Sequence, residues 1–186
     1  SGYIFSPKQG YIHLGCKFAS NTNPYIKAQQ KTFKLINEYK KFKLNLSNLV
    51  FMQVESALRP KDFFIKKVCI GAKDKKKIIV GNINTYRDYS WVTEVIKAVI
   101  LTSNLKSKDY IISAGQKLSG KDILAIAYKI NNLDFRKYFK VNNKFFRKNE
   151  NKLLIGSKKN SQHLKIRKFR FKIYGDKLVK KMYKNI

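Results

Sequence analysis

The feature that most constrains the fold is the alternation of helix-like and strand-like segments along the chain. Four stretches carry apolar residues at helical spacing, and three short apolar runs between them fit buried strands. The expected helices cover about 25–41, 91–100, 119–130 and the segment around 178–182. The expected strands are 44–52, 76–80 and 110–113. Such alternation predicts an α/β fold.

Local signals support three of these helices. Pro24 precedes the first helix, where its fixed φ suits a helical start. Ser119 and Asp122 form a capping-box pattern before the third helix. The last helix is expected from Leu178, Val179 and Met182. The apolar face of the second helix is predicted to consist of six residues, namely Trp91, Val92, Val95, Ile96, Val99 and Ile100.

Composition narrows the class of protein. The chain has 186 residues, 44% of them hydrophobic, which is enough for a folded core and excludes a disordered chain. No apolar run is long enough for a membrane span, and no signal peptide opens the sequence. Two cysteines, Cys16 and Cys69, cannot build a disulfide framework, so we expect a cytoplasmic protein without a metal site.

The net charge of +30 suggests nucleic-acid binding, but the residue types weaken that interpretation. Only six of the 41 basic residues are arginines, although arginine is the side chain suited to bidentate phosphate recognition. We therefore interpret the charge as a lysine-coated surface, with nucleic acid an unlikely partner. A basic nucleic-acid-associated protein that reuses the scaffold stays open as the alternative, as does a gene product without selected activity.

A Gly-rich turn for a dinucleotide is missing. An α/β protein that binds a dinucleotide carries glycines between its opening strand and helix, where backbone N–H groups approach the pyrophosphate. No such spacing of glycines occurs in this sequence. The chain by itself is therefore not expected to form the main cradle of a nicotinamide cofactor.

Several strings, in order, resemble segments of one enzyme family. The resemblance is carried by Val50–Pro60, Phe63–Lys67, Gly81–Ser90, Asp109–Gly115 and Phe145–Gly156. They are similar to the Leu-Phe-Asn-His-Glu-Ser-Pro-Arg-Arg-Gly, Phe-Val-Thr-Arg-Lys, Gly-Asn-Leu-x-x-x-Arg-Asp-Trp-Gly, Asp-Asp-Tyr-Val-Ile-Ala-Thr-Gly and Tyr-Phe-Arg-Pro-x-Glu strings of GDP-mannose 4,6-dehydratases. Those enzymes are extended short-chain dehydrogenase/reductases. The strings extend over nearly the whole chain.

The resemblance implies the C-terminal half of such a protein. Residues 1–186 would form one unit, with an incomplete NAD(P)-binding Rossmann fold over about 1–55. A small α/β lobe that binds the nucleotide sugar would follow over about 56–186. The family activity is a lyase reaction that oxidises C4 of the sugar with NADP, eliminates water across C5–C6 and returns the hydride to C6. We expect NADP not to be bound by this chain alone.

The catalytic positions are only partly kept. The family's Ser-Pro-Tyr-x-x-x-Lys resembles residues 23–29, with Tyr25 kept and Gln29 in place of the lysine that lowers the phenol pKa. Its Thr-Ser-Glu string resembles 1–3, so Ser1 could contact the C4 oxygen. Tyr3 replaces the carboxylate that takes the C5 proton. Without the resemblance, Tyr25 would be read as a packing residue.

The binding positions are better kept. On the cofactor side Arg59 matches an arginine of the family, whereas Val54 replaces a histidine. On the side of the GDP-sugar the implied residues are Gln53, Lys66, Lys67, Arg87, Arg147 and Glu150. The resemblance thus suggests a truncated or degenerate member that retains GDP-sugar binding, either as a homo-oligomer or with the N-terminal half on another chain. The simpler local reading is that Arg87 pairs with Asp88 and that Glu55 caps a loop.

Overall fold

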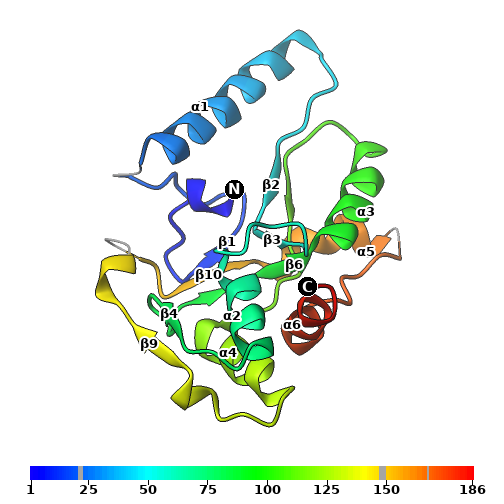
Figure 1. The fold of residues 1–186 in the computed structure, drawn as a ribbon. Coiled ribbons are helices and arrows are strands. Elements are labelled where there is room, and N and C mark those ends of the chain that lie inside the picture. Colours follow the sequence, from blue (N-terminus) through cyan, green and yellow to red (C-terminus); the bar gives the residue numbers. More distant parts are fainter. Residues whose placement is uncertain (21–22, 147–149, 167) are drawn as a thin grey trace.

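The computed structural model describes residues 1–20, 23–146, 150–166 and 168–186, and they form an α/β fold (Figure 1). The α-helices are α1 (Pro24–Tyr39), α2 (Phe64–Lys73), α3 (Val92–Ser103), α4 (Gly120–Lys129), α5 (Gln162–Ile166) and α6 (Gly175–Lys184). The strands are β1 (Tyr11–Ile12), β2 (Leu49–Phe51), β3 (Gln53–Glu55), β4 (Ile78–Val80), β5 (Tyr86–Arg87), β6 (Tyr89–Trp91), β7 (Tyr110–Ile112), β8 (Leu118–Ser119), β9 (Phe139–Val141) and β10 (Leu153–Gly156). Short 3-10 helices are η1 (Gly2–Ile4), η2 (Lys40–Phe42), η3 (Phe135–Lys137), η4 (Asn143–Phe145) and η5 (Lys158–Ser161).

Nearly all strand pairs are parallel and join segments far apart in sequence. The order β1-β10-β5-β8 forms one sheet, in which only the β5–β8 pair is antiparallel. Three further parallel pairs are β2–β7, β3–β6 and β4–β9. Parallel pairing requires crossover connections, which the helices between the strands supply. The α/β class predicted from the sequence is confirmed.

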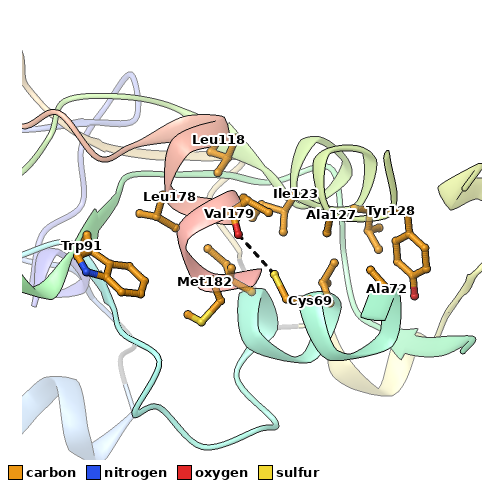
Figure 2. Close-up of a cluster of buried hydrophobic side chains, with 13 residues drawn as sticks. Cys69, Ala72, Trp91, Leu118, Ile123, Ala127, Tyr128, Leu178, Val179 and Met182 are labelled. Carbon is orange, nitrogen blue, oxygen red and sulfur yellow. Dashed lines mark hydrogen bonds between the residues drawn. The ribbon is translucent and has the colours of Figure 1, made fainter. Parts of the chain in front are cut away.

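The largest apolar core lies where three helices meet. Helices α2, α4 and α6 pack together, and Figure 2 shows their side chains converging with Trp91 from β6. The predicted Leu178, Val179 and Met182 of α6 are fully buried there. The Cys69 thiol of α2 contacts the Val179 carbonyl oxygen at 3.8 Å, drawn as the dashed line in Figure 2. This core thus forms where the apolar faces of three amphipathic helices meet.

A second, smaller core holds α1 to the N-terminal segment. Asn23 caps α1 by accepting the Ile26 N–H at 3.0 Å, with Pro24 in the first turn as predicted. Ile26 is the only buried residue of α1, and Phe33 packs against Phe5 and Phe18. In Figure 1, α1 lies at the opposite end of the molecule from α4. Most of its surface is therefore exposed.

Two sequence predictions need correction in detail. The strand expected over 44–52 is regular only at Leu49–Phe51, and Leu44 is exposed. The helix expected over 91–100 exists as α3, but Ile96 and Ile100 point to solvent. The predicted Val95 is buried, and the other buried residues of α3 are Glu94, Ala98 and Thr102. The apolar pattern therefore located α3 and part of its buried face, but it wrongly included Ile96 and Ile100.

The structure confirms the capping box predicted for α4 and contains a further helix, α2, that the sequence pattern did not predict. The capping box is present, with Ser119 Oγ accepting the Asp122 N–H at 3.0 Å and the Asp122 carboxylate accepting the Ser119 N–H at 2.9 Å. Helix α2 was not predicted, although it is central to the core. Among the described residues, no helix has the length and apolar character to cross a membrane, and no group of ligands suits a metal ion.

Candidate functional site

One large cavity, of about 1090 Å³, opens between the N-terminal segment, the start of α1 and the strands β2, β3 and β5. A volume of this size suits an extended ligand larger than a monosaccharide. Six of the nine site residues predicted from the sequence line it, namely Ser1, Tyr25, Gln53, Arg59, Arg87 and Glu150. The fold therefore brings together residues that are separated by almost 150 positions in the chain.

The phenol of Tyr3 lies at the centre of a polar network in this cavity. Its oxygen accepts the Gln53 amide N–H at 3.1 Å and the Arg87 Nε–H at 3.2 Å. Tyr3 enters from η1, Gln53 from β3 and Arg87 from β5. The residue that replaces the family's carboxylate thus contacts two of the residues implied for substrate binding.

Arg87 is almost completely engaged by the protein. Besides Tyr3, its guanidinium donates to the Tyr86 and Asn151 carbonyl oxygens and, at 2.8 Å, to Glu150 Oε1. Four of its five N–H donors are accounted for, and Arg87 is only 5% exposed. The expected local pair between Arg87 and Asp88 is therefore wrong, because the guanidinium reaches across to Glu150.

Asp88 has a structural role instead. Its Oδ2 accepts the backbone N–H groups of Gly115 at 2.9 Å and Gly156 at 3.1 Å. Burial raises the pKa of Asp88 to about 7, and these hydrogen bonds oppose that shift. A Cβ at Gly156 would stand 2.1 Å from the Ser113 oxygen, so glycine is required for the close approach of β10. Asp88 thus fastens β10 to the loop after β7.

Arg59 stands at another wall of the cavity. Its guanidinium donates to Glu55 Oε1 and to the Val54 carbonyl oxygen, both at 2.8 Å, and stacks 3.7 Å from the Phe63 ring centroid. Burial raises the pKa of Glu55 to about 7, opposed by the charge and hydrogen bond of Arg59. Glu55 therefore holds Arg59 through an ion pair rather than only capping a loop. Within the described residues, Arg59 makes hydrogen bonds only through Nη1, so its other N–H groups could donate to an anion.

The candidate catalytic residues Ser1 and Tyr25 line the cavity together with Gln29. Tyr25 is 64% exposed, and Gln29 lies one turn further along the same face of α1. The buried Gln29 Oε1 has no hydrogen-bond partner among the residues that the structure describes. Ser1 caps η1 by accepting the Tyr3 backbone N–H at 3.4 Å. The side chains of Tyr25, Gln29 and Ser1 can donate and accept hydrogen bonds, and none of these three side chains carries a positive charge.

Two of the predicted residues, Lys66 and Lys67, lie elsewhere, and a third is outside the described residues. The Lys66 ammonium donates to the carbonyl oxygens of Ala57 and Arg59, at 2.7 and 2.8 Å, and so closes the loop before α2. The Lys67 ammonium lies 5.8 Å from the Phe145 ring centroid. Neither lysine lines the cavity. Arg147 is outside the described residues, so its predicted role rests on the resemblance alone.

The cavity fits one part of a nicotinamide cofactor. The Tyr25 hydroxyl and the unsatisfied Gln29 carbonyl oxygen could meet ribose hydroxyls. In a Rossmann fold, the diphosphate of the dinucleotide is held by backbone N–H groups of a Gly-rich turn, and the sequence contains no such turn. The described residues therefore fit the ribose of such a cofactor but not its diphosphate.

Reasoning from the sequence alone missed two features of the site. It treated Tyr3 only as the loss of a carboxylate and did not foresee its contact with Arg87. It also missed that Phe63 supports Arg59. The spacing of Glu55 and Arg59, four residues apart, was the one available signal for their pairing.

Solved structures with a similar fold include enzymes in complex with a nucleotide sugar, a nicotinamide cofactor or both. The UDP-glucuronic acid 4-epimerase of Bacillus cereus, in complex with UDP-glucuronic acid and NAD, superposes with a TM-score of 0.83 at 14% identity, covering 98% of this chain and 58% of that chain. The RMD structure from Pseudomonas aeruginosa, complexed with NADPH, superposes with a TM-score of 0.80 at 13% identity, covering 100% of this chain and 63% of that chain. The dTDP-glucose 4,6-dehydratase of Bacillus anthracis, in complex with NAD, superposes with a TM-score of 0.75 at 15% identity, covering 98% of this chain and 59% of that chain.

These similarities show that the chain has the fold of the epimerase and dehydratase structures named above. The chain spans only about 60% of the length of the structures that it matches. The family model described as GDP-mannose 4,6 dehydratase matches residues 17–182, and the chain belongs to that family. The resemblance inferred from the sequence is confirmed.

Proposed function

We propose that the cavity binds a GDP-sugar such as GDP-mannose and that the chain is a degenerate family member, unable to carry out the full dehydration by itself. The observation that carries the proposal is the convergence of Gln53, Arg87 and Glu150 with Tyr25 in one cavity of suitable volume. The solved neighbours in complex with UDP-glucuronic acid or UDP-glucose support a nucleotide sugar as the ligand.

The contacts suggest different roles for the charged residues of the cavity. Because Arg87 already pairs with Glu150, its main role is to hold that carboxylate, whose second oxygen can accept ribose hydroxyls. The resemblance matches Arg59 to an arginine on the cofactor side, but Arg59 lines the same cavity as Arg87 and Glu150. In this proposal Arg59 therefore meets the diphosphate, together with Arg147 as the resemblance implies. Arginine suits this task because its planar fork can bind two phosphate oxygens at once.

Calorimetric titration with GDP-mannose, GDP and UDP-glucose tests binding. We expect GDP-mannose to bind, and Arg147→Ala or Arg59→Ala to weaken it roughly ten- to a hundred-fold through loss of a charge-assisted contact. Lys97→Ala, an exposed change of the same sign on α3, is the matched control and should leave the affinity unchanged. Equal binding by wild type and both arginine variants would contradict this site.

The loss of catalysis is proposed from two substitutions. Tyr3 offers no carboxylate, and Gln29 offers no cation beside Tyr25. We propose that the family cofactor NADP is not bound appreciably unless another polypeptide supplies the Gly-rich half. Calorimetry with NADP checks this, and micromolar affinity for the isolated chain would overturn it.

The degenerate reading has its own test. In protein complemented with the N-terminal half of a family member, we expect no 4-keto-6-deoxy sugar from GDP-mannose and NADP. Product should appear only when Gln29→Lys and Tyr3→Glu are combined. Turnover by the unmutated chain would show that the two positions have been assigned wrongly.

A further inference from the structure

A basic segment, the strap of residues 168–174, joins α5 to α6 (Figure 1). Exposed and half-buried residues alternate along it, which is typical of an extended chain with one side on the protein. The exposed residues are Lys168, Arg170, Lys172 and Tyr174, and the half-buried ones are Phe169, Phe171 and Ile173. The strap therefore presents three cationic side chains on its outer side.

The inner side of the strap is anchored to the protein. Phe169 and Phe171 meet edge to face, with ring centroids 5.4 Å apart, in an apolar cluster with residues of α3 and β7. Glu94 of α3 holds the backbone, since its two carboxylate oxygens accept the Lys172 and Ile173 N–H groups, each at 2.9 Å. A segment held in this way loses little conformational freedom when it binds a ligand.

The cations of the strap are not neutralised by the part of the chain that the structure describes. Lys168, Arg170 and Lys172 form no salt bridge with a described carboxylate. Glu94 is engaged by backbone N–H groups, and Asp176, just after the strap, pairs with Lys180 at 2.9 Å. The positive charge of the strap is therefore available to an anionic ligand.

We propose that the strap binds an extended single strand of nucleic acid through its phosphates. Alternate residues of an extended chain lie about 6.5 Å apart, which is comparable with the separation of neighbouring phosphates on a nucleic-acid strand. Arg170 suits a phosphate because its planar fork can bind two oxygens at once. Two of the six arginines, Arg167 and Arg170, belong to this basic stretch, although Arg167 is outside the described residues.

The strap fits a nucleic-acid strand better than a lipid surface. Lipid headgroups have no fixed spacing, and peripheral segments bind membranes more firmly when apolar side chains insert. Here Phe169 and Phe171 are packed against the protein instead. No residue of the strap lines the cavity, so this proposal does not depend on the function proposed for the cavity.

A fluorescein-labelled oligouridylate of about twelve nucleotides is the probe, titrated with the full chain and followed by fluorescence anisotropy. Binding should weaken as salt is raised. The triple variant Lys168→Gln, Arg170→Gln, Lys172→Gln should bind roughly tenfold or more weakly at fixed salt. Its plot of log affinity against log salt should be shallower by about 2, because each phosphate contact on a single strand contributes about 0.7 to the slope.

The matched control is the triple variant Lys75→Gln, Lys77→Gln, Lys140→Gln. It removes the same number of charges from exposed lysines near β4 and β9 and should change neither the affinity nor the slope by much. Circular dichroism of both variants checks that they fold. Saturating GDP-mannose should leave the affinity for the oligonucleotide unchanged, because the strap lies outside the cavity.

Three outcomes would overturn the proposal. Equal weakening by both triple variants would mean that only net charge matters. Displacement of the oligonucleotide by GDP-mannose would place it in the cavity. Strap-dependent binding of polyglutamate or of phosphatidylserine vesicles, without binding of the oligonucleotide, would assign the strap to an acidic protein or to a membrane.

Discussion

The three-helix core of α2, α4 and α6 and the region around the cavity are built on different principles. In the core, apolar faces of neighbouring helices cover one another completely. Around the cavity, polar side chains from distant segments hold one another, and α1 leaves one face open. The first region is stabilised mainly by burial of apolar area. The second combines a smaller apolar core with a network of hydrogen-bonded polar groups. The two regions should therefore respond differently to mutation and to pH.

The largest effect is expected when the buried ion pair at the cavity is broken. Arg87→Met leaves Glu150 and the carbonyl oxygens of Tyr86 and Asn151 without their donor, which should lower the free energy of unfolding by about 3–5 kcal/mol. Urea denaturation measures the change.

The control is Arg136→Met, since the Arg136–Asp134 pair has side chains that are 78% and 33% exposed. An exposed pair contributes little to stability, because water screens both charges. If both variants lowered the free energy of unfolding by the same amount, the network at the cavity would stabilise the fold no more than an exposed ion pair does.

Truncation in the three-helix core should come next. Leu178→Ala removes a fully buried side chain between α2 and α4 and should cost about 2–5 kcal/mol. Leu178→Met keeps the volume and should cost less than about 1.5 kcal/mol. The midpoints of urea denaturation compare the two. A small effect of the alanine variant would mean that this core is not closely packed.

Buried carboxyl groups near the cavity should make stability depend on pH. The pKa of Asp88 is raised from 3.8 to about 7 in the folded chain, so the folded state binds more protons in that range. Its contribution to stability is therefore complete at low pH and is lost as the pH rises toward 7. The pKa of Glu55 is also raised to about 7, so its contribution to stability is likewise lost as the pH rises. Burial lowers the pKa of His163, so the contribution of His163 changes with pH in the opposite direction.

Asp88→Asn isolates this contribution. The stability difference between wild type and Asp88→Asn should change by roughly 1–3 kcal/mol between pH 5 and pH 7.5, on the order expected for a shift of a few units. Leu178→Met, which titrates nothing, should run parallel to wild type. A difference that stays constant with pH would show that Asp88 keeps its charge throughout.

The smallest effect is expected on the outer face of α1. Leu35→Ala removes an exposed side chain from this face and should change the free energy of unfolding by less than about 0.5 kcal/mol. The same substitution at Leu178 provides the comparison. A loss well above 1 kcal/mol for Leu35→Ala would mean that the Leu35 side chain is already covered in the isolated chain.

The difference between the two regions also explains which predictions succeeded. The positions of α1, α4 and α6 could be predicted because capping residues and apolar spacing act within a few turns of one helix. The strand at 44–52 was predicted too long, and α2 was missed. The cavity residues Gln53, Arg87 and Glu150 were found only through the family resemblance, because nothing in their local sequence marks them as neighbours.

The sequence by itself determined the α/β class, the capped helices and the family to which the chain belongs. Only the tertiary structure decided that Arg87 pairs with Glu150, 63 residues away, rather than with the adjacent Asp88. It also decided that the phenol of Tyr3, 84 residues from Arg87, completes this network. The physical reason is that a helix depends on contacts a few residues apart. A polar network between strands depends instead on which distant segments the parallel pairing brings together.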